Sequence, residues 1–210
     1  MQIIPTILEK QFDLAEEKIK LIKDEIRWIQ IDVIDNVYLP GKTFELERLT
    51  RSQLNTENIL WETHLMVNEP IKWIEKSNFI DAARIIGQVE MMSDLEEFVS
   101  KVKDTAEAGL AFDIETEIKE IPEETDLVLL MARKAGFESQ EFDDRIFEKI
   151  EKLKIMREER DLRFKIGVDG GINENNIEKL KEAGVDVAYC GGAIFNGNVL
   201  NNLENLKSHV

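Results

Sequence analysis

Two aspartates and a histidine stand at the ends of short apolar segments, the arrangement expected of a site built at the ends of β-strands. Asp32 ends one such segment, His64 another, and Asp169 a third. Side chains alternate along a strand, so Gln30 and Asp32 face the same way and can line one cavity. Two carboxylates and an imidazole can hold a divalent cation while one or both carboxylates transfer protons. The three residues therefore predict a metal-assisted acid–base site.

Each of these residues also has a purely structural interpretation. An aspartate before two glycines is typical of a turn, Asp32 and Asp35 can cap loops, and a single histidine at a strand end is often a buried structural residue. Their occurrence at three matching strand ends favours the functional interpretation.

Glycines follow the last three predicted strands. They are Gly136, the pair Gly170 and Gly171, and the pair Gly191 and Gly192. Backbone N–H groups exposed by glycine in such loops form a frequent phosphate site, so we predict a phosphorylated ligand. The alternative is that they form ordinary tight turns.

β-Branched segments alternate with longer amphipathic segments about eight times, which predicts repeated βα units. The predicted strands are residues 3–8, 28–33, 59–66, 84–89, 108–112, 127–131, 164–168 and 187–190, and the clearest predicted helices are residues 12–26, 95–106, 142–159 and 174–183. We predict an α/β fold, a (β/α)₈ TIM barrel forming a single domain over residues 1–210. A doubly wound open sheet is the alternative, but its glycine-rich turn is missing after the first strand.

Composition excludes several classes of protein. The 27 Lys and Arg against 43 Asp and Glu give a net charge of −16, which argues against nucleic-acid binding. Cys190 is the single cysteine, so a disulfide-stapled secreted domain is excluded and a reducing, cytoplasmic location is expected. No apolar run approaches the roughly 20 residues of a membrane span.

At these residues the chain resembles the ribulose-phosphate 3-epimerase family. The similarity is colinear over almost the whole chain, and the most specific segments are His64-Leu65-Met66 and Val168-Asp169-Gly170-Gly171-Ile172. It implies epimerisation at C3 of a ketose phosphate, D-ribulose 5-phosphate or a close analogue, and a homo-oligomer.

The resemblance also implies roles for individual residues. Asp32, His64 and Asp169 would bind a divalent cation, either Mn²⁺, Fe²⁺, Zn²⁺ or Mg²⁺. Asp32 and Asp169 would exchange protons with opposite faces of the sugar through an enediolate. Met66 and Met131 would wall the intermediate, and Thr6 stands in place of a serine.

The chain departs from the family at several positions. Gln30 replaces the first metal-binding histidine, where it would offer the ion its amide oxygen or no ligand at all. Gln88 replaces another histidine at the substrate pocket. The loop after the sixth strand places Glu138 where a phosphate is normally bound, and Gly192 replaces a serine. These changes leave open a non-catalytic barrel that binds a phosphorylated metabolite or a protein partner. A related decarboxylase or aldolase is disfavoured, because no predicted strand carries the Asp-x-Lys-x-x-Asp motif.

Overall fold

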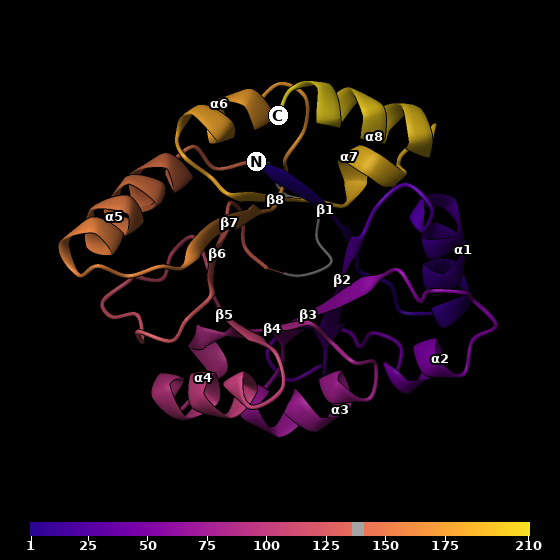
Figure 1. The fold of residues 1–210 in the computed structure, drawn as a ribbon, viewed down its shortest axis with the longest axis horizontal. Coiled ribbons are helices and arrows are strands. Elements are labelled where there is room, and N and C mark those ends of the chain that lie inside the picture. Colours follow the sequence, from indigo (N-terminus) through magenta and orange to yellow (C-terminus); the bar gives the residue numbers. More distant parts are fainter. Residues whose placement is uncertain (136–140) are drawn as a thin grey trace.

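The computed structural model describes residues 1–135 and 141–210, and in these residues eight parallel strands form a closed barrel. Each strand pairs with the next one along the chain, and β8 returns to pair with β1. Figure 1 looks into the ring of strands. The strands are β1 Gln2–Ile7, β2 Trp28–Ile34, β3 Leu60–Met66, β4 Arg84–Gln88, β5 Glu107–Phe112, β6 Leu127–Met131, β7 Lys165–Asp169 and β8 Val187–Cys190.

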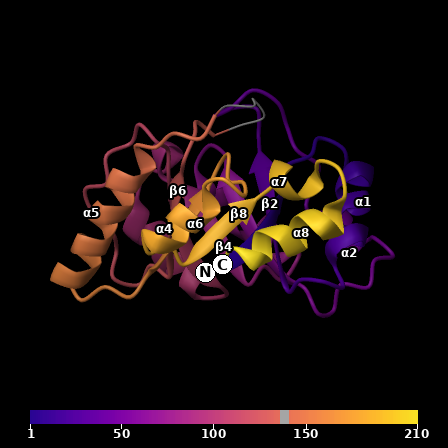
Figure 2. The ribbon, with the colours of Figure 1, turned by 90° about the horizontal axis from the view of Figure 1, so that it is seen from above.

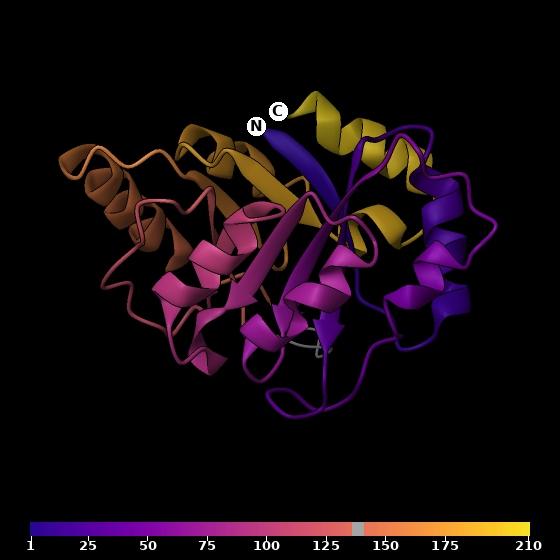
Figure 3. The same ribbon diagram turned by 60° about the horizontal axis from the view of Figure 1, so that its bottom comes forward.

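Helices surround the strands on the outside of the ring (Figures 1 and 3). Each longer helix buries one apolar face: in α1, Phe12, Ala15, Ile19 and Ile22 recur every three or four residues and are buried. The helices are α1 Phe12–Ile22, α2 Glu47–Thr50, α3 Ile74–Asn78, α4 Leu95–Lys103, α5 Ile146–Glu159, α6 Ile177–Glu182, α7 Gly192–Phe195 and α8 Val199–Ser208, with short 3-10 helices at Pro70–Trp73 and Val89–Met91. None of the helices described is both long and apolar enough to pass through a membrane.

The closed barrel confirms the predicted fold class, and the pairing of Gln2 with Val187 excludes an open doubly wound sheet. Every predicted strand is present to within one residue at each end.

The predicted helices were too long. The helix expected over residues 12–26 ends at Ile22, where a turn brings the N–H of Glu25 onto the Ile22 carbonyl. The helix expected from residue 142 begins at Ile146, because Asp143 forms a turn in which its carboxylate accepts the N–H of Arg145. The helices expected over residues 95–106 and 174–183 are likewise shortened to α4 and α6.

Side chains on the strands alternate between the layer under the helices and the barrel interior. The interior holds an apolar cluster that includes Ile4, Ile86 and Leu129. Towards the amino ends of the strands, the guanidinium of Arg84 pairs with Glu62, lies 3.4 Å from the hydroxyl of Tyr189 and stacks 4.5 Å from the ring centre of Trp28. Arg84, Glu62 and Tyr189 are each at most 1% exposed, so packed side chains close this end of the interior. We call Trp28, Glu62, Arg84 and Tyr189 the barrel floor.

The two chain termini lie side by side at the amino-terminal end of the barrel (Figures 1 and 2). The loops that follow the strands gather at the opposite end. That is the end at which a parallel barrel positions side chains for chemistry.

Candidate functional site

A cavity of about 840 Å³ opens at the carboxyl ends of the strands. Its walls come from β1, β2, β3, β6, β7 and β8 and from the loops after them. The residues predicted from sequence that line it are Thr6, Asp32, Met66, Met131, Asp169, Gly171, Gly191 and Gly192. The cavity therefore brings together predicted residues that are up to 186 positions apart in the sequence, from Thr6 to Gly192.

Asp32, His64 and Asp169 converge beside this cavity. Asp32 on β2 is in register with His64 on β3, so the two side chains are neighbours on the interior face. Asp169 reaches them from the end of β7, and one ligand atom from each of the three residues lies within 4.8 Å of the others. All three side chains are buried. The geometry thus assembles the three residues predicted from sequence.

Hydrogen bonds hold both carboxylate oxygens of Asp32. The hydroxyl of Thr6 donates to Oδ2 at 2.9 Å, and the side-chain amide of Gln30 donates to Oδ1 at 2.9 Å. The same amide nitrogen lies 3.0 Å from the hydroxyl oxygen of Thr6. Gln30 therefore turns its NH₂ group, rather than its amide oxygen, towards Asp32, and in this orientation it positions the carboxylate.

The environment of the site shifts the protonation of Asp169 and His64. Burial and the nearby charge of Asp32 raise the pKa of Asp169 to about 7. Burial opposes protonation of His64, but the nearby carboxylates of Asp32 and Asp169 outweigh it and raise the pKa of the imidazole. A carboxyl group that titrates near neutral pH is suited to both giving and accepting a proton.

The donor atoms fit a divalent cation. Nδ1 of His64 lies 3.3 Å from Oδ1 of Asp32, yet this buried nitrogen makes no hydrogen bond to any residue the structure describes. A buried nitrogen without a partner, facing two carboxylates, is the arrangement that a metal ion would satisfy. One nitrogen and two carboxylate ligands would also leave coordination positions open for substrate oxygens.

The glycines predicted to bind phosphate lie at several places. Gly171, Gly191 and Gly192 line the cavity, and Gly170 lies beneath the side chain of Arg133. Gly171 has φ +69°, and a Cβ there would approach the backbone of Phe142 to 3.1 Å, so a side chain would be strained. Gly136 and Glu138 lie outside the described residues.

Three basic side chains line the cavity that sequence reasoning did not single out: Lys18, Arg133 and Lys134. Lys18 projects from α1, where its Nζ lies 2.7 Å from Glu9 and 4.9 Å from the ring centre of Phe195. Arg133 and Lys134 directly follow β6, and this pair of basic residues after a strand was a signal available in the sequence. In a chain of net charge −16, these side chains supply positive charge where an anionic ligand would enter.

Gln88 and Asp35 lie next to the site but outside the cavity lining. Gln88 is fully buried behind His64, with its amide oxygen 2.9 Å from Nε2 of the imidazole. Asp35 accepts hydrogen bonds from the N–H groups of Val37 and Asn68, so it fixes two loops. Its interpretation as a loop cap matches these contacts.

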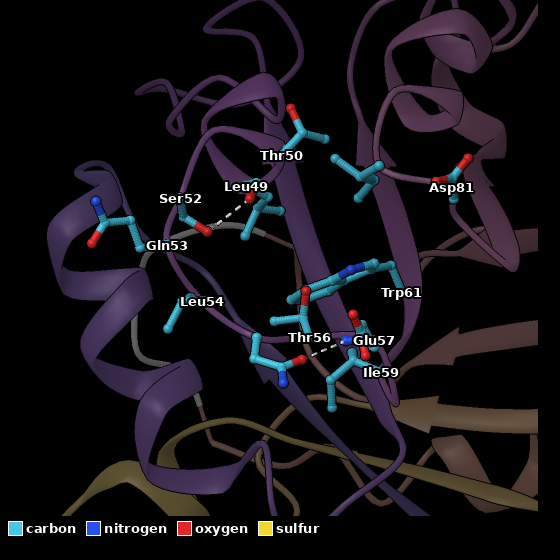
Figure 4. Close-up of a pocket in the computed structure, with 12 residues that line it drawn as sticks. Leu49, Thr50, Ser52, Gln53, Leu54, Thr56, Glu57, Ile59, Trp61 and Asp81 are labelled. Atoms are coloured by element: carbon cyan, nitrogen blue, oxygen red, sulfur yellow. Dashed lines mark hydrogen bonds between the residues drawn. The ribbon is translucent and has the colours of Figure 1, made fainter.

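A second cavity, of about 560 Å³, lies near the amino end of β3 (Figure 4). The segment from Leu49 to Ile59 forms one side of it, and Trp61 and Asp81 form the other. Hydrogen bonds within the segment, from Ser52 to the Leu49 carbonyl and from the N–H of Glu57 to Asn55, shape its wall. Its titratable residues among the lining that the structure describes are Glu57 and Asp81, and both are acids.

Comparison with known proteins assigns a family. Residues 2–195 match the model of the ribulose-phosphate 3 epimerase family. The chain is 31% identical over 198 residues to ribulose-phosphate 3-epimerase of Aquifex aeolicus, covering 92% of this chain and 89% of the relative. It is 30% identical over 201 residues to the enzyme of the same name from Synechocystis, covering 92% and 87% of the two chains.

Solved structures with the same architecture are more distant in sequence. Phosphoribosyl anthranilate isomerase from Thermus thermophilus superposes with a TM-score of 0.66 at 11% identity, covering 100% of this chain and 98% of that one. For 3-hexulose-6-phosphate synthase from Salmonella typhimurium the TM-score is 0.67 at 12% identity, with 100% and 98% covered. At such low identity these similarities concern the fold alone.

Proposed function

The chain belongs to the ribulose-phosphate 3-epimerase family, and we propose that it epimerises C3 of a ketose phosphate, D-ribulose 5-phosphate or a close analogue. The observation that carries the proposal is the convergence of Asp32, His64 and Asp169, with ligand atoms within 4.8 Å of one another. The reaction needs two acid–base groups, and both aspartates are present.

Asp32, His64 and Asp169 would together hold the divalent cation, either Mn²⁺, Fe²⁺, Zn²⁺ or Mg²⁺. When bound, the ion would supply positive charge that stabilises the negative oxygens of an enediolate. Gln30 would contribute by holding Asp32 through its NH₂ group. A softer nitrogen-rich site would favour Zn²⁺, whereas one nitrogen among carboxylates favours oxygen-tolerant ions such as Mn²⁺ or Mg²⁺.

Asp32 and Asp169 would lie on opposite faces of the sugar and exchange protons with C3. One carboxylate removes the C3 proton, and the other carboxyl group returns a proton to the opposite face. In the metal-free protein the pKa of Asp169 is raised to about 7, so this carboxyl group can both give and accept a proton near neutral pH. Thr6 and Gln30 keep Asp32 in one orientation throughout.

The remaining lining residues would bind the rest of the substrate. Met66 and Met131 would cover the reactive carbon and exclude water, since both are buried and line the cavity. Backbone N–H groups at Gly171, Gly191 and Gly192 would receive the phosphate. The same role for Gly136, which lies outside the described residues, stays a prediction. Lys18 would add positive charge at the same end.

The experiment is an assay of purified protein on D-ribulose 5-phosphate with Mn²⁺, Fe²⁺, Zn²⁺ or no metal, following formation of D-xylulose 5-phosphate. We expect turnover that depends on metal and disappears in Asp169→Asn. D-Allulose 6-phosphate serves as the analogue. A well-folded protein inactive on both sugars under every condition would contradict the proposal.

A non-catalytic barrel is the second candidate, favoured by the replacement of family histidines at Gln30 and Gln88. Exchange of the C3 hydrogen of the sugar with deuterated water separates the two functions. A non-catalytic barrel would bind the sugar phosphate without exchanging its C3 hydrogen for deuterium. Its affinity for the sugar phosphate would be the same in Asp169→Asn as in the wild type.

A further inference from the structure

Behind His64, a chain of hydrogen bonds runs along the end of β4. The Nε2 atom of His64 lies 2.9 Å from Oε1 of Gln88, and Nε2 of Gln88 donates to Oε2 of Glu90 at 2.6 Å. The other oxygen of Glu90 accepts the backbone N–H of Asp113 at 2.8 Å. Each oxygen of Glu90 therefore accepts a hydrogen bond, which holds the carboxylate in one orientation.

The direction of each hydrogen bond follows from which groups can donate. A carboxylate only accepts, so Glu90 requires the NH₂ side of the Gln88 amide. This fixes the amide oxygen of Gln88 against His64. An amide oxygen also only accepts, so Nε2 of His64 must carry the hydrogen. Glu90 therefore determines that Nε2 of His64 is the donor, although Glu90 does not contact the imidazole.

A neutral imidazole has one N–H group, so a hydrogen on Nε2 leaves Nδ1 with a bare lone pair. Nδ1 is the atom that faces Asp32 at 3.3 Å and makes no hydrogen bond to a described residue. In this state it can bind a cation, whereas a hydrogen on Nδ1 would point at Asp32 and block the position.

We propose that Glu90 is a positioning residue that, through Gln88, sets the tautomer of His64 and so prepares Nδ1 to bind metal. The inference rests on the metal site of the proposed function, but the tautomer itself is a property of the metal-free protein. The replacement of a family histidine by Gln88 then preserves an acceptor for Nε2.

Glu90→Gln tests the proposal with a change of almost no volume. The backbone N–H of Asp113 still requires an acceptor, so the new amide must direct its oxygen there and its NH₂ group to Gln88. Gln88 then reverses, presenting its own NH₂ group to His64. We expect the hydrogen to move to Nδ1 and metal affinity to fall about 10- to 100-fold.

The double variant Gln88→Glu with Glu90→Gln should rescue both properties. The new carboxylate at position 88 accepts from Nε2 of His64 and from the new amide at position 90, whose oxygen still accepts from Asp113. Every donor again meets an acceptor, and the net charge equals that of the wild type. Glu96→Gln, on the exposed face of α4, is the control for the loss of one negative charge in the single variant.

The first measurement is ¹⁵N NMR of histidine-labelled, metal-free protein. The pH is raised from about 9 until the ¹⁵N shifts of His64 show a neutral ring, because the pKa of this imidazole is raised above its usual range. The chain has two histidines, and His209→Asn identifies the signals of His64. The second measurement is Mn²⁺ affinity by calorimetry. Circular dichroism confirms that each variant is folded.

The expected pattern is Nε2–H in the wild type, the double variant and Glu96→Gln, and Nδ1–H in Glu90→Gln, with affinity following the tautomer. A wild type with its hydrogen on Nδ1, or a folded Glu90→Gln that keeps it on Nε2, would overturn the inference. A third outcome is that the tautomers behave as expected but none of the proteins binds Mn²⁺, Fe²⁺ or Zn²⁺. Glu90 then still sets the tautomer of His64. Its role in metal binding is overturned, and the proposed metal-dependent function is overturned with it.

Discussion

The hydroxyl of Thr6 donates a hydrogen bond of 2.9 Å to Oδ2 of Asp32, which joins the ends of two adjacent strands, β1 and β2. The amide of Gln30 donates to the other oxygen of the same carboxylate. Asp32 is therefore held in one orientation from two sides before any ligand binds. Such preorganisation matters because a carboxylate displaced by a fraction of an ångström loses its alignment with the reacting carbon.

Removing the Thr6 hydroxyl should impair catalysis without unfolding the protein. We expect Thr6→Val, which keeps the shape of the side chain, to lower kcat/KM about 10- to 100-fold, because Asp32 loses a fixed donor. Thr6→Ser keeps the hydroxyl and should stay close to the wild type. Steady-state kinetics on D-ribulose 5-phosphate checks this, and equal activity of the two variants would show that the hydrogen bond is dispensable.

Gln30→His should strengthen metal binding. Gln30 now offers NH₂ to Asp32, whereas an imidazole at the same place can offer a nitrogen to the ion. We expect Zn²⁺ to bind at least about tenfold more tightly, with a smaller gain for Mg²⁺, because nitrogen ligands suit zinc better. Calorimetric titration measures both ions. Gln30→Leu is the control, and a similar gain in that variant would attribute the effect to the loss of the amide.

Lys18→Gln should weaken substrate binding more than turnover. Its charge lies at the cavity wall, where it forms an ion pair with Glu9. We expect KM to rise about 3- to 10-fold with kcat nearly unchanged, the result of losing an interaction made equally in the ground and transition states. Lys20→Gln, which removes an exposed lysine paired with Glu16 on the same helix, is the matched control. Identical KM values for the two variants would show that Lys18 does not contact the substrate.

Arg84→Met should strongly destabilise the barrel. The substitution leaves Glu62 buried without its cation, which costs about 3 to 5 kcal/mol in the free energy of unfolding. Urea denaturation followed by circular dichroism measures this cost. The double variant with Glu62→Leu removes the buried, unpaired carboxylate and should recover most of the lost free energy of unfolding. If the double variant is no more stable than Arg84→Met, the loss arises from packing around Arg84 instead.

The cost of Arg84→Met should also depend on pH. Burial raises the pKa of Glu62 even though the charge of Arg84 lowers it, so the folded protein binds a proton at this residue more readily than the unfolded chain does. Stability from this group is therefore present at low pH and is lost as pH rises through the window between the unfolded and folded pKa values. Without Arg84 the folded pKa rises further, so the variant should be closer to the wild type at about pH 5 than at about pH 8. Urea midpoints at the two pH values check the sign.

Sequence periodicity was sufficient to predict the strands but not the ends of the helices. The strand Leu127–Met131 is a continuous apolar run that begins directly after Asp126 and ends two residues before Arg133, so its limits are visible in the sequence to within one residue. The end of α1 at Ile22 is set by a turn that leads into β2, and the residues of that turn are ordinary helix formers. Tertiary structure, rather than local propensity, decides where such helices stop.

The candidate site was likewise predicted only in part from the sequence. The positions of Asp32, His64 and Asp169 at strand ends follow from the alternation of side chains and the topology of the barrel. The approach of Lys18 to the cavity depends on how α1 is rotated against the strands, which one sequence does not determine. The contact between Gln88 and Glu90 depends on how the chain leaves β4 and enters a short 3-10 helix.

The barrel floor determines the side from which molecules would reach the cavity. Arg84 and Glu62 fill the interior on the amino side of the cavity, with the Tyr189 hydroxyl against Arg84, and among the described residues these buried side chains separate the cavity from that end. If the protein catalyses the proposed reaction, substrate and product would enter and leave through the same opening, at the carboxyl ends of the strands. Water would use the same opening, so the share of solvent hydrogen found in the product would report how readily bulk water reaches Asp32 and Asp169 during turnover.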